Sequence, residues 1–142
     1  MFVLGGLVCA TWLSAQDYQK TAYGIKAAAG GVDVEVQFFT PSVVRVVKSP
    51  QGEHFEKKSL AVVASPGEVG VKVGIKDGAI VMDTKVLQVN LDTSTGAFSY
   101  RTADGKLLLA EKPVEKSFVP FDDAGDATYN VYQAFKLDAD EA

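Results

Sequence analysis

From residue 24 onward, apolar and polar side chains alternate with a period of two, which is typical of β-strands that bury one face. In Val32–Phe38 (VDVEVQF), four apolar side chains share one face and three polar side chains share the other. Val43–Lys48 (VVRVVK) is nearly apolar on both faces except for Arg45, so we expect this strand at the centre of a sheet. No segment of ten or more residues has helical spacing.

Turn sequences separate further short strands. Asp77-Gly78 is a two-residue hairpin signal, and Asp92–Gly96 and Asp104-Gly105 also predict turns. A longer loop is expected over Glu111–Thr128. The remaining predicted strands are Leu60–Val63, Val69–Lys76, Ala79–Met82, Leu87–Leu91, Ala97–Arg101, Lys106–Ala110 and Tyr129–Leu137.

Eight to ten short strands at this spacing predict an all-β protein, either an antiparallel sandwich or a barrel. Several strands carry apolar residues on both faces, which favours two packed sheets. The composition agrees, because 20 Val and 3 Ile stand against 10 Leu, and branching at Cβ suits a pleated sheet. We therefore expect one β-sandwich domain over residues 17–142.

Charge and length exclude several classes of function. The net charge is −4 and no basic block is present, which argues against nucleic acid or an anionic membrane surface as the main partner. An α/β barrel needs about 250 residues. The chain has 142 residues, so it is too short to form one.

Met1–Gln16 carries no charged side chain. Its apolar run, Phe2–Leu13, is shorter than the roughly 20 residues that span a bilayer, and the small residues Ser14 and Ala15 follow it. We interpret residues 1–16 as a secretory signal peptide without a basic start, and we expect a periplasmic or secreted protein with no membrane span. Two alternatives stay open: Met1 is a misassigned internal start, or the segment is a buried strand or helix of the domain.

Few residues carry candidate chemistry. Cys9 lies in the predicted signal peptide, and His54 is the single histidine, which we interpret as an exposed loop residue. Asp122, Asp123 and Asp126 could offer oxygen ligands to a hard cation, but their spacing matches no EF-hand, so we interpret them as a solvated acidic loop. We therefore predict no catalytic, cofactor-binding or metal-binding residue and no cofactor.

Several aromatic residues lie off the clearest core faces of the predicted strands. Exposed rings suit sugar binding, because the C–H faces of a sugar pack on them. We interpret these rings instead as core or inter-domain contacts; they are Trp12, Tyr18, Tyr23, Phe39 and Tyr132.

Three stretches together carry a resemblance to a known family. Val34–Gly52 (VEVQFFTPSVVRVVKSPQG) resembles the amino-terminal domain of bacterial members of glycoside hydrolase family 31, which includes α-xylosidases and α-glucosidases. Phe55–Leu60 (FEKKSL) and Asp122–Ala142 (DDAGDATYNVYQAFKLDADEA) resemble the segments that follow in that domain. No single motif is diagnostic; the order and spacing of the three give the match.

The resemblance implies a supersandwich similar to galactose-mutarotase-like domains. In the family this domain packs on a catalytic (β/α) barrel and helps to shape the pocket for an oligosaccharide substrate. The barrel carries the nucleophile and the general acid/base of a retaining mechanism, so no catalytic residue transfers to this chain.

From the resemblance we expect a fragment that is inactive by itself and whose partner is the barrel of the parent chain. We also expect an exposed apolar patch toward that barrel, around Tyr132. The resemblance does not distinguish xyloside from glucoside as substrate. The alternative function is a free-standing carbohydrate-binding or adhesion-type sandwich.

Overall fold

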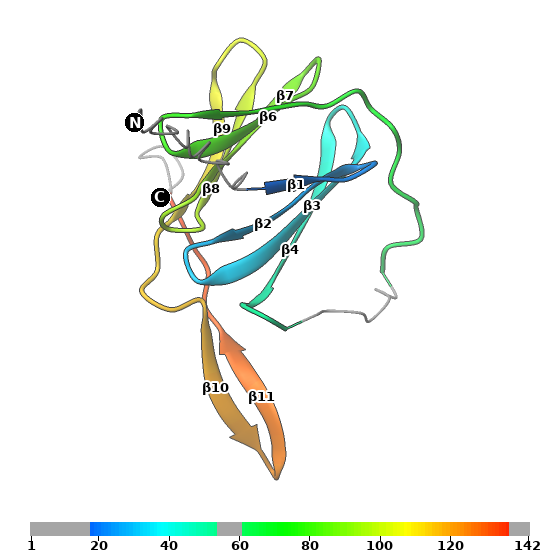
Figure 1. Cartoon of the computed structure of the whole chain (residues 1–142). Helices are drawn as coiled ribbons and strands as arrows, with labels where there is room; N and C mark the ends of the chain where they lie inside the picture. Colours follow the sequence, from blue (N-terminus) through cyan, green and yellow to red (C-terminus); the bar gives the residue numbers. More distant parts are fainter. Residues whose placement is uncertain (1–17, 54–60, 137–142) are drawn as a thin grey trace, which may run out of the picture.

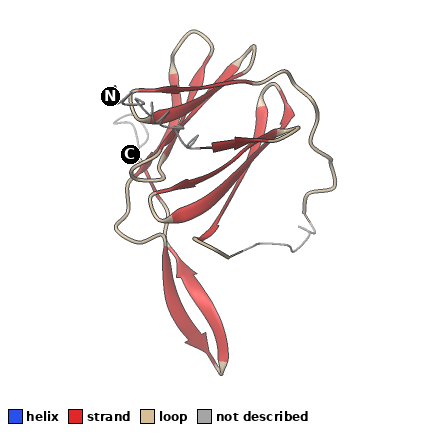
Figure 2. Ribbon diagram, viewed as in Figure 1, coloured by secondary structure: helices blue, strands red, loops and turns tan. Residues whose placement is uncertain are grey.

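The computed structural model describes residues 18–53 and 61–136, and every regular element in them is a β-strand (Figure 2). The predicted signal peptide with Cys9 and Trp12, and also His54, lie outside the described residues. The strands are β1 (Tyr18–Lys20), β2 (Gly24–Ala29), β3 (Val32–Thr40), β4 (Val43–Pro50), β5 (Lys72–Lys76), β6 (Ala79–Asp83), β7 (Leu87–Asp92), β8 (Phe98–Thr102), β9 (Leu107–Lys112), β10 (Phe118–Asp123), β11 (Asp126–Val131) and β12 (Ala134–Phe135).

The strands form three antiparallel sheets (Figure 1). A four-stranded sheet has the order β1-β2-β3-β4, and a six-stranded sheet has the order β12-β9-β8-β7-β6-β5. The third sheet is the β10–β11 hairpin, which projects away from the other two (Figure 1). The predicted all-β antiparallel sandwich is confirmed.

The core lies between the inner faces of the two larger sheets. Buried and half-buried positions alternate from Val32 to Phe38 along β3, as the sequence pattern predicts. Burial of an aliphatic or aromatic side chain contributes about 1.5–3 kcal/mol, so this contact is the main force that holds the sheets together. The largest fully buried side chains are Ile25, Val36 and Phe38 from one sheet and Ile80, Met82, Val89, Leu91 and Phe98 from the other.

The two larger sheets come into backbone contact where the β2–β3 turn meets the β7–β8 turn. Gly30 N donates a hydrogen bond to Thr93 O at 3.2 Å across this contact. Gly96 has φ +70°, and a Cβ on it would lie 2.8 Å from Ala29 O. The turn therefore needs glycine here, both for its left-handed backbone and for the space.

Gly96→Ala should lower the stability of the domain by roughly 2–4 kcal/mol, because a positive φ is strained for alanine and the Cβ collides with backbone. Gly70→Ala is the matched control, since Gly70 has φ +64° and a Cβ added to it would have no atom within 4 Å. It should cost only about 1 kcal/mol. Urea unfolding of both variants measures the difference, and equal losses would contradict the close approach.

The same β7–β8 turn is held by one carboxylate. Asp92 Oδ1 accepts hydrogen bonds from Ser94 Oγ at 2.6 Å, from Ser94 N at 2.9 Å and from Thr95 N at 2.9 Å. These bonds lower the pKa of Asp92 below its ordinary value, and the bond from the Ser94 side chain has the largest effect. The charged form of Asp92 is therefore favoured in the folded state.

Because the folded pKa lies below the unfolded value, Asp92 contributes stability that is present above pH ~4 and is lost as the pH falls through the folded pKa. Asp92 is exposed, so the effect should stay below about 1 kcal/mol. Thermal melts from pH 6 to pH 2.5 should show a smaller acid destabilisation for Asp92→Asn than for the parent chain. Asp126→Asn is the control, and parallel curves for all three proteins would contradict this role.

Two predictions about the last third of the chain are wrong. The predicted loop Glu111–Thr128 contains β10. In all, residues 18–53 and 61–136 form twelve strands, against the eight to ten expected for the chain. The β10–β11 turn uses Ala124 and Gly125 at φ 54° and 97°, and Ala-Gly is not one of the usual hairpin pairs. The predicted strand Tyr129–Leu137 is divided after Val131, where β11 ends. The chain then leaves the hairpin, and Ala134–Phe135 pair with β9. Leu137 lies outside the described residues.

Three further predictions need correction. Residues 61–63 of the predicted strand Leu60–Val63 form no strand, and Val63 is 96% exposed, so no sheet face buries it; Leu60 is not described. The predicted strand Val69–Lys76 begins only at Lys72. Val43–Lys48 is not central, because β4 is the outer strand of its sheet in the described part of the chain.

Candidate functional site

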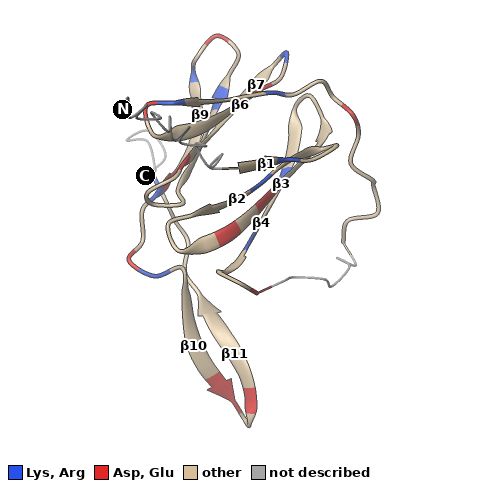
Figure 3. Ribbon diagram, in the orientation of Figure 1, with Lys and Arg blue, Asp and Glu red and all other residues tan. Residues whose placement is uncertain are grey.

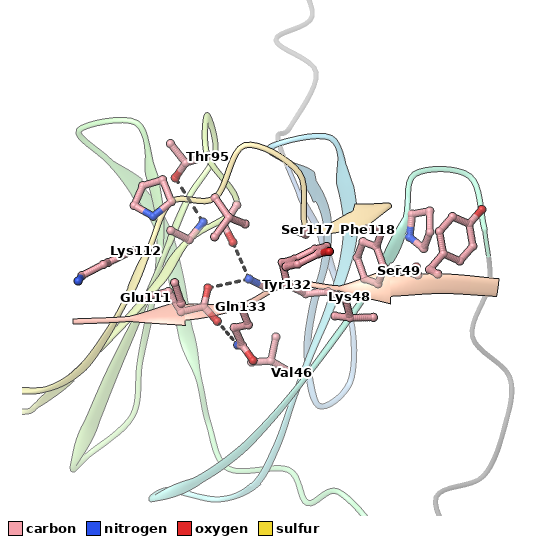
Figure 4. A pocket seen from close by; sticks show the side chains of 18 of the residues that line it. Val46, Lys48, Ser49, Thr95, Glu111, Lys112, Ser117, Phe118, Tyr132 and Gln133 are labelled. Atoms are coloured by element: carbon pink, nitrogen blue, oxygen red, sulfur yellow. Dashed lines mark hydrogen bonds and ion pairs between the residues drawn. The ribbon is translucent and has the colours of Figure 1, made fainter. Parts of the chain in front are cut away.

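A pocket of about 520 Å³ lies where β4, the β8–β9 pair and the base of the β10–β11 hairpin meet (Figure 4). Its wall combines aromatic rings with polar side chains. Its lining includes Lys48 from β4, Tyr100 from β8, Glu111 from β9, and Phe118, Tyr129 and Tyr132 from the hairpin and its base.

At the centre of this region Lys48 and Glu111 form an ion pair. Lys48 Nζ lies 2.6 Å from Glu111 Oε2, and the two side chains are 18% and 5% exposed. Lys48 pairs with Val34 in the β3–β4 register, so its side chain shares the inner face of the sheet with the core valines. The pair therefore joins the four-stranded sheet to the six-stranded sheet.

Both members of the pair have further partners, and Figure 4 shows Lys48, Glu111 and Gln133 close together. Glu111 accepts hydrogen bonds from Phe98 N at 3.0 Å and from Gln133 Nε2 at 2.5 Å. Lys48 Nζ also donates to Gly96 O at 2.9 Å and lies 5.1 Å from the centre of the Phe98 ring. Buried charges need such partners, because an unpaired charge away from water costs several kcal/mol.

Aromatic residues line the rest of the pocket. The Tyr100 ring stacks on Phe98 with 6.0 Å between ring centres. Burial first, and then the negative charge of Glu111, raise the pKa of Tyr100 well above its ordinary value, so its hydroxyl stays protonated. At the hairpin base the Phe118 and Tyr129 rings meet edge to face at 6.1 Å, and Tyr129 OH donates to Glu53 Oε1 at 2.5 Å.

The acidic side chains of the pocket have hydrogen-bond partners within the chain. Both carboxylates that line the pocket already accept hydrogen bonds, Glu111 from three donors and Glu53 from Tyr129. Among residues 18–53 and 61–136, no group of three His, Cys, Asp or Glu side chains could hold a metal ion. The expectation that the chain carries no catalytic residue stays a prediction.

The acidic cluster named from the sequence lies far along the hairpin. Asp122 and Asp123 end β10 and Asp126 begins β11, and all three are exposed. Asp122 Oδ1 accepts a hydrogen bond from Gly125 N at 2.9 Å, which fixes the turn. Figure 3 shows acidic residues at the hairpin's end, so the cluster is exposed but belongs to a strand turn and not to a loop.

Sequence reasoning missed the two charged residues at the centre of the pocket. Lys48 ends a run whose alternation with Val44 and Val46 already places it on the inner face. Glu111 follows the apolar run Leu107–Ala110 in the same way. A charge at an inward position on two strands was the available signal, and pairing them needs the three-dimensional structure.

The fold and this site define a β-sandwich unit with a mixed aromatic and polar pocket at one end. No family model matches the chain. The chain is similar to the GH31 α-xylosidase from Xanthomonas citri, with 26% identity over 86% of this chain and a TM-score of 0.75. A GH31 α-xylosidase from a soil metagenome, solved in complex with xylose, shares the fold at 19% identity over 66% of this chain, with a TM-score of 0.54.

In both comparisons the chain spans 14% of the solved enzyme. The match therefore fits a partial domain of a family 31 glycoside hydrolase, without the rest of the enzyme. In the part of the chain that the structure describes, no helix is long and apolar enough to cross a membrane.

Lys48→Met should destabilise the domain by about 3 kcal/mol, because it leaves the buried Glu111 carboxylate without its cation. The double variant Lys48→Met/Glu111→Gln should cost clearly less than the sum of its single changes. Lys26→Met is the control: Lys26 lies 4.0 Å from Glu35 in an exposed pair, and its loss should cost less than about 0.5 kcal/mol. Urea unfolding measures the stability of Lys48→Met, Glu111→Gln, the double variant and Lys26→Met. If the losses of stability of the two single variants add up to the loss of the double variant, the coupling is contradicted.

Proposed function

We propose that the chain is the amino-terminal β-sandwich module of a family-31-like α-glycosidase of carbohydrate metabolism. In this function it supports a catalytic (β/α) barrel of the parent chain and helps to shape that barrel's pocket for an oligosaccharide. The substrate is an α-xyloside or an α-glucoside. The module itself carries no catalytic residue, and the protein is exported to the periplasm or secreted.

One observation carries the proposal: 86% of this chain superimposes on 14% of a GH31 α-xylosidase with a TM-score of 0.75. A similarity that covers nearly all of one chain and a small part of another is expected for a module of a larger enzyme. The fold alone would not suffice, because sandwiches serve many functions. The identity of 26% and the three resembling sequence stretches add to it.

The β10–β11 hairpin supports a docking role. Phe121 and Val131 are 48% and 66% exposed on it, and Tyr132 at its base is 53% exposed. A two-stranded hairpin is at best marginally stable in water when nothing covers it, so a second body packed on its apolar side chains would stabilise it. Tyr132 and its neighbours are therefore the proposed contact with the barrel.

A free-standing carbohydrate-binding sandwich is the second candidate, and the pocket is the observation that favours it. A volume of about 520 Å³ suits a small ligand. The rings of Tyr129 and Tyr132 beside hydrogen-bonding side chains resemble the mixture that sugars need. Tyr100 also lines the pocket, where its ring stacks on Phe98.

The purified chain should not hydrolyse 4-nitrophenyl α-xyloside or α-glucoside, because the residues of the retaining mechanism belong to the barrel. The protein purified from its source organism should hydrolyse one of the two. Release of 4-nitrophenol measures both. Turnover by the repurified 142-residue chain, or a native protein inactive on both substrates, would contradict the proposal.

Isothermal calorimetry separates the two candidate functions. The module should show no measurable heat of binding with xylo- or gluco-oligosaccharides, since the barrel supplies most of the substrate pocket. Affinity that is abolished by Tyr129→Ala and kept by the control Tyr18→Ala would favour the free-standing binding sandwich instead.

A further inference from the structure

The longest outer strand of the two larger sheets, within the described residues, is β4. The outer strands of the two larger sheets are β1, β4, β5 and β12, with 3, 8, 5 and 2 residues. Natural edge strands are usually short or carry charges that block pairing with another strand. β5 follows this rule with Lys72 and Lys76, and β1 and β12 are short. β4 carries Arg45 and Lys48 and ends at Pro50, but it is the longest of the four and contains four valines.

The backbone of β4 is paired on one side only. Its partner is β3, and Val43–Ser49 make no other backbone–backbone hydrogen bond within residues 18–53 and 61–136. In an antiparallel strand every second residue points its N–H and C=O away from the partner. An inward charge can block pairing, but the charge of Lys48 is already neutralised by Glu111 at 2.6 Å.

The sheet opposite β4 extends beyond it. The four-stranded sheet ends at β4, and the six-stranded sheet continues through β9 to β12. The pocket opens in this place, lined by Val46 and Lys48 on one side and by Tyr100 and Glu111 on the other. Leu109, which shares the face of Glu111 in the strand alternation, is 41% exposed. The inner face of the larger sheet therefore lacks a cover beside β4.

The sequence of β4 fits an internal position better than an edge. Val43–Val47 is apolar on both faces except for Arg45, which predicts a central strand, yet β4 has one neighbour in the described residues. A second neighbour would resolve this disagreement. It would also pair the free backbone groups and cover the pocket.

We propose that β4 is an internal strand in the whole protein, and that a fifth strand, from polypeptide beyond the residues described, pairs with its free edge. That strand alternates apolar side chains, which enter the pocket over Tyr100 and Leu109, with polar ones on the outer face. Its source rests on the proposed function: a chain that spans 14% of the solved enzyme leaves ample sequence to supply it.

Amide hydrogen exchange along β4 tests the proposal in two proteins, the isolated 142-residue chain and the native protein purified from its organism. In the isolated chain, the β4 amides that point away from β3 should exchange fast. This set consists either of Val44, Val46 and Lys48 or of Arg45, Val47 and Ser49. In the native protein this set should exchange at least about tenfold more slowly, while β3 stays unchanged.

The outcomes separate this inference from the proposed function. Fast exchange of the alternate set in a native protein that hydrolyses an α-xyloside or α-glucoside would overturn the fifth strand and leave the proposed function intact. Protection in a dimer of 142-residue chains would overturn both, because a second copy would then supply the strand. Protection in a longer, active protein supports both.

Two neighbouring proline variants give an independent test, since proline removes one backbone N–H. Of Val46→Pro and Val47→Pro, one removes an N–H bonded to β3 and the other removes an N–H on the free edge. The free-edge variant should keep the melting temperature of the isolated chain within about 2 °C and lower that of the native protein by about 5 °C or more. Equal shifts in the two proteins would overturn the proposal.

Discussion

The ion pair between Lys48 and Glu111 is the interaction on which the arrangement of the sheets at the pocket depends. It joins β4 to β9 across the interior, and through Phe98 N, Gly96 O and Gln133 it also ties down the β7–β8 turn and the chain that leaves the hairpin. A buried pair is rarely a large net source of stability, because removing two charges from water is costly. Its effect is positional, since the partners of both charges lie on several elements that must be held in place together.

The region around the β7–β8 turn combines a close backbone contact with an open pocket. At Gly96, backbone approaches backbone so closely that no side chain fits. Beside the same turn, the pocket is bordered by Thr95 and Gly96, β4 is an outer strand in the described residues, and the hairpin carries exposed apolar side chains. These open surfaces are expected of a module that packs against more polypeptide on this side.

The sequence predicts the core well and the pocket poorly, for a physical reason. Alternation along Val32–Phe38 and Leu87–Leu91 is local, so the strands, their inner faces and the sandwich follow directly from it. Lys48 and Glu111 are 63 positions apart, and local patterns contain no information about such a pairing. The hairpin was missed because Ala124 occupies a turn position where a more usual residue would have been recognised. The resemblance to family 31 came from the order of several stretches and agrees with the structural comparison.

The most direct test of the module's place in a larger enzyme is an experimental structure of the protein that the whole gene encodes. We expect the sandwich to pack on a catalytic barrel with at least about 600 Å² buried between them. The β10–β11 hairpin should lie in that interface, and β4 should have a strand on each side. A sandwich joined to other domains only by a linker, or a gene product without a barrel, would contradict this expectation.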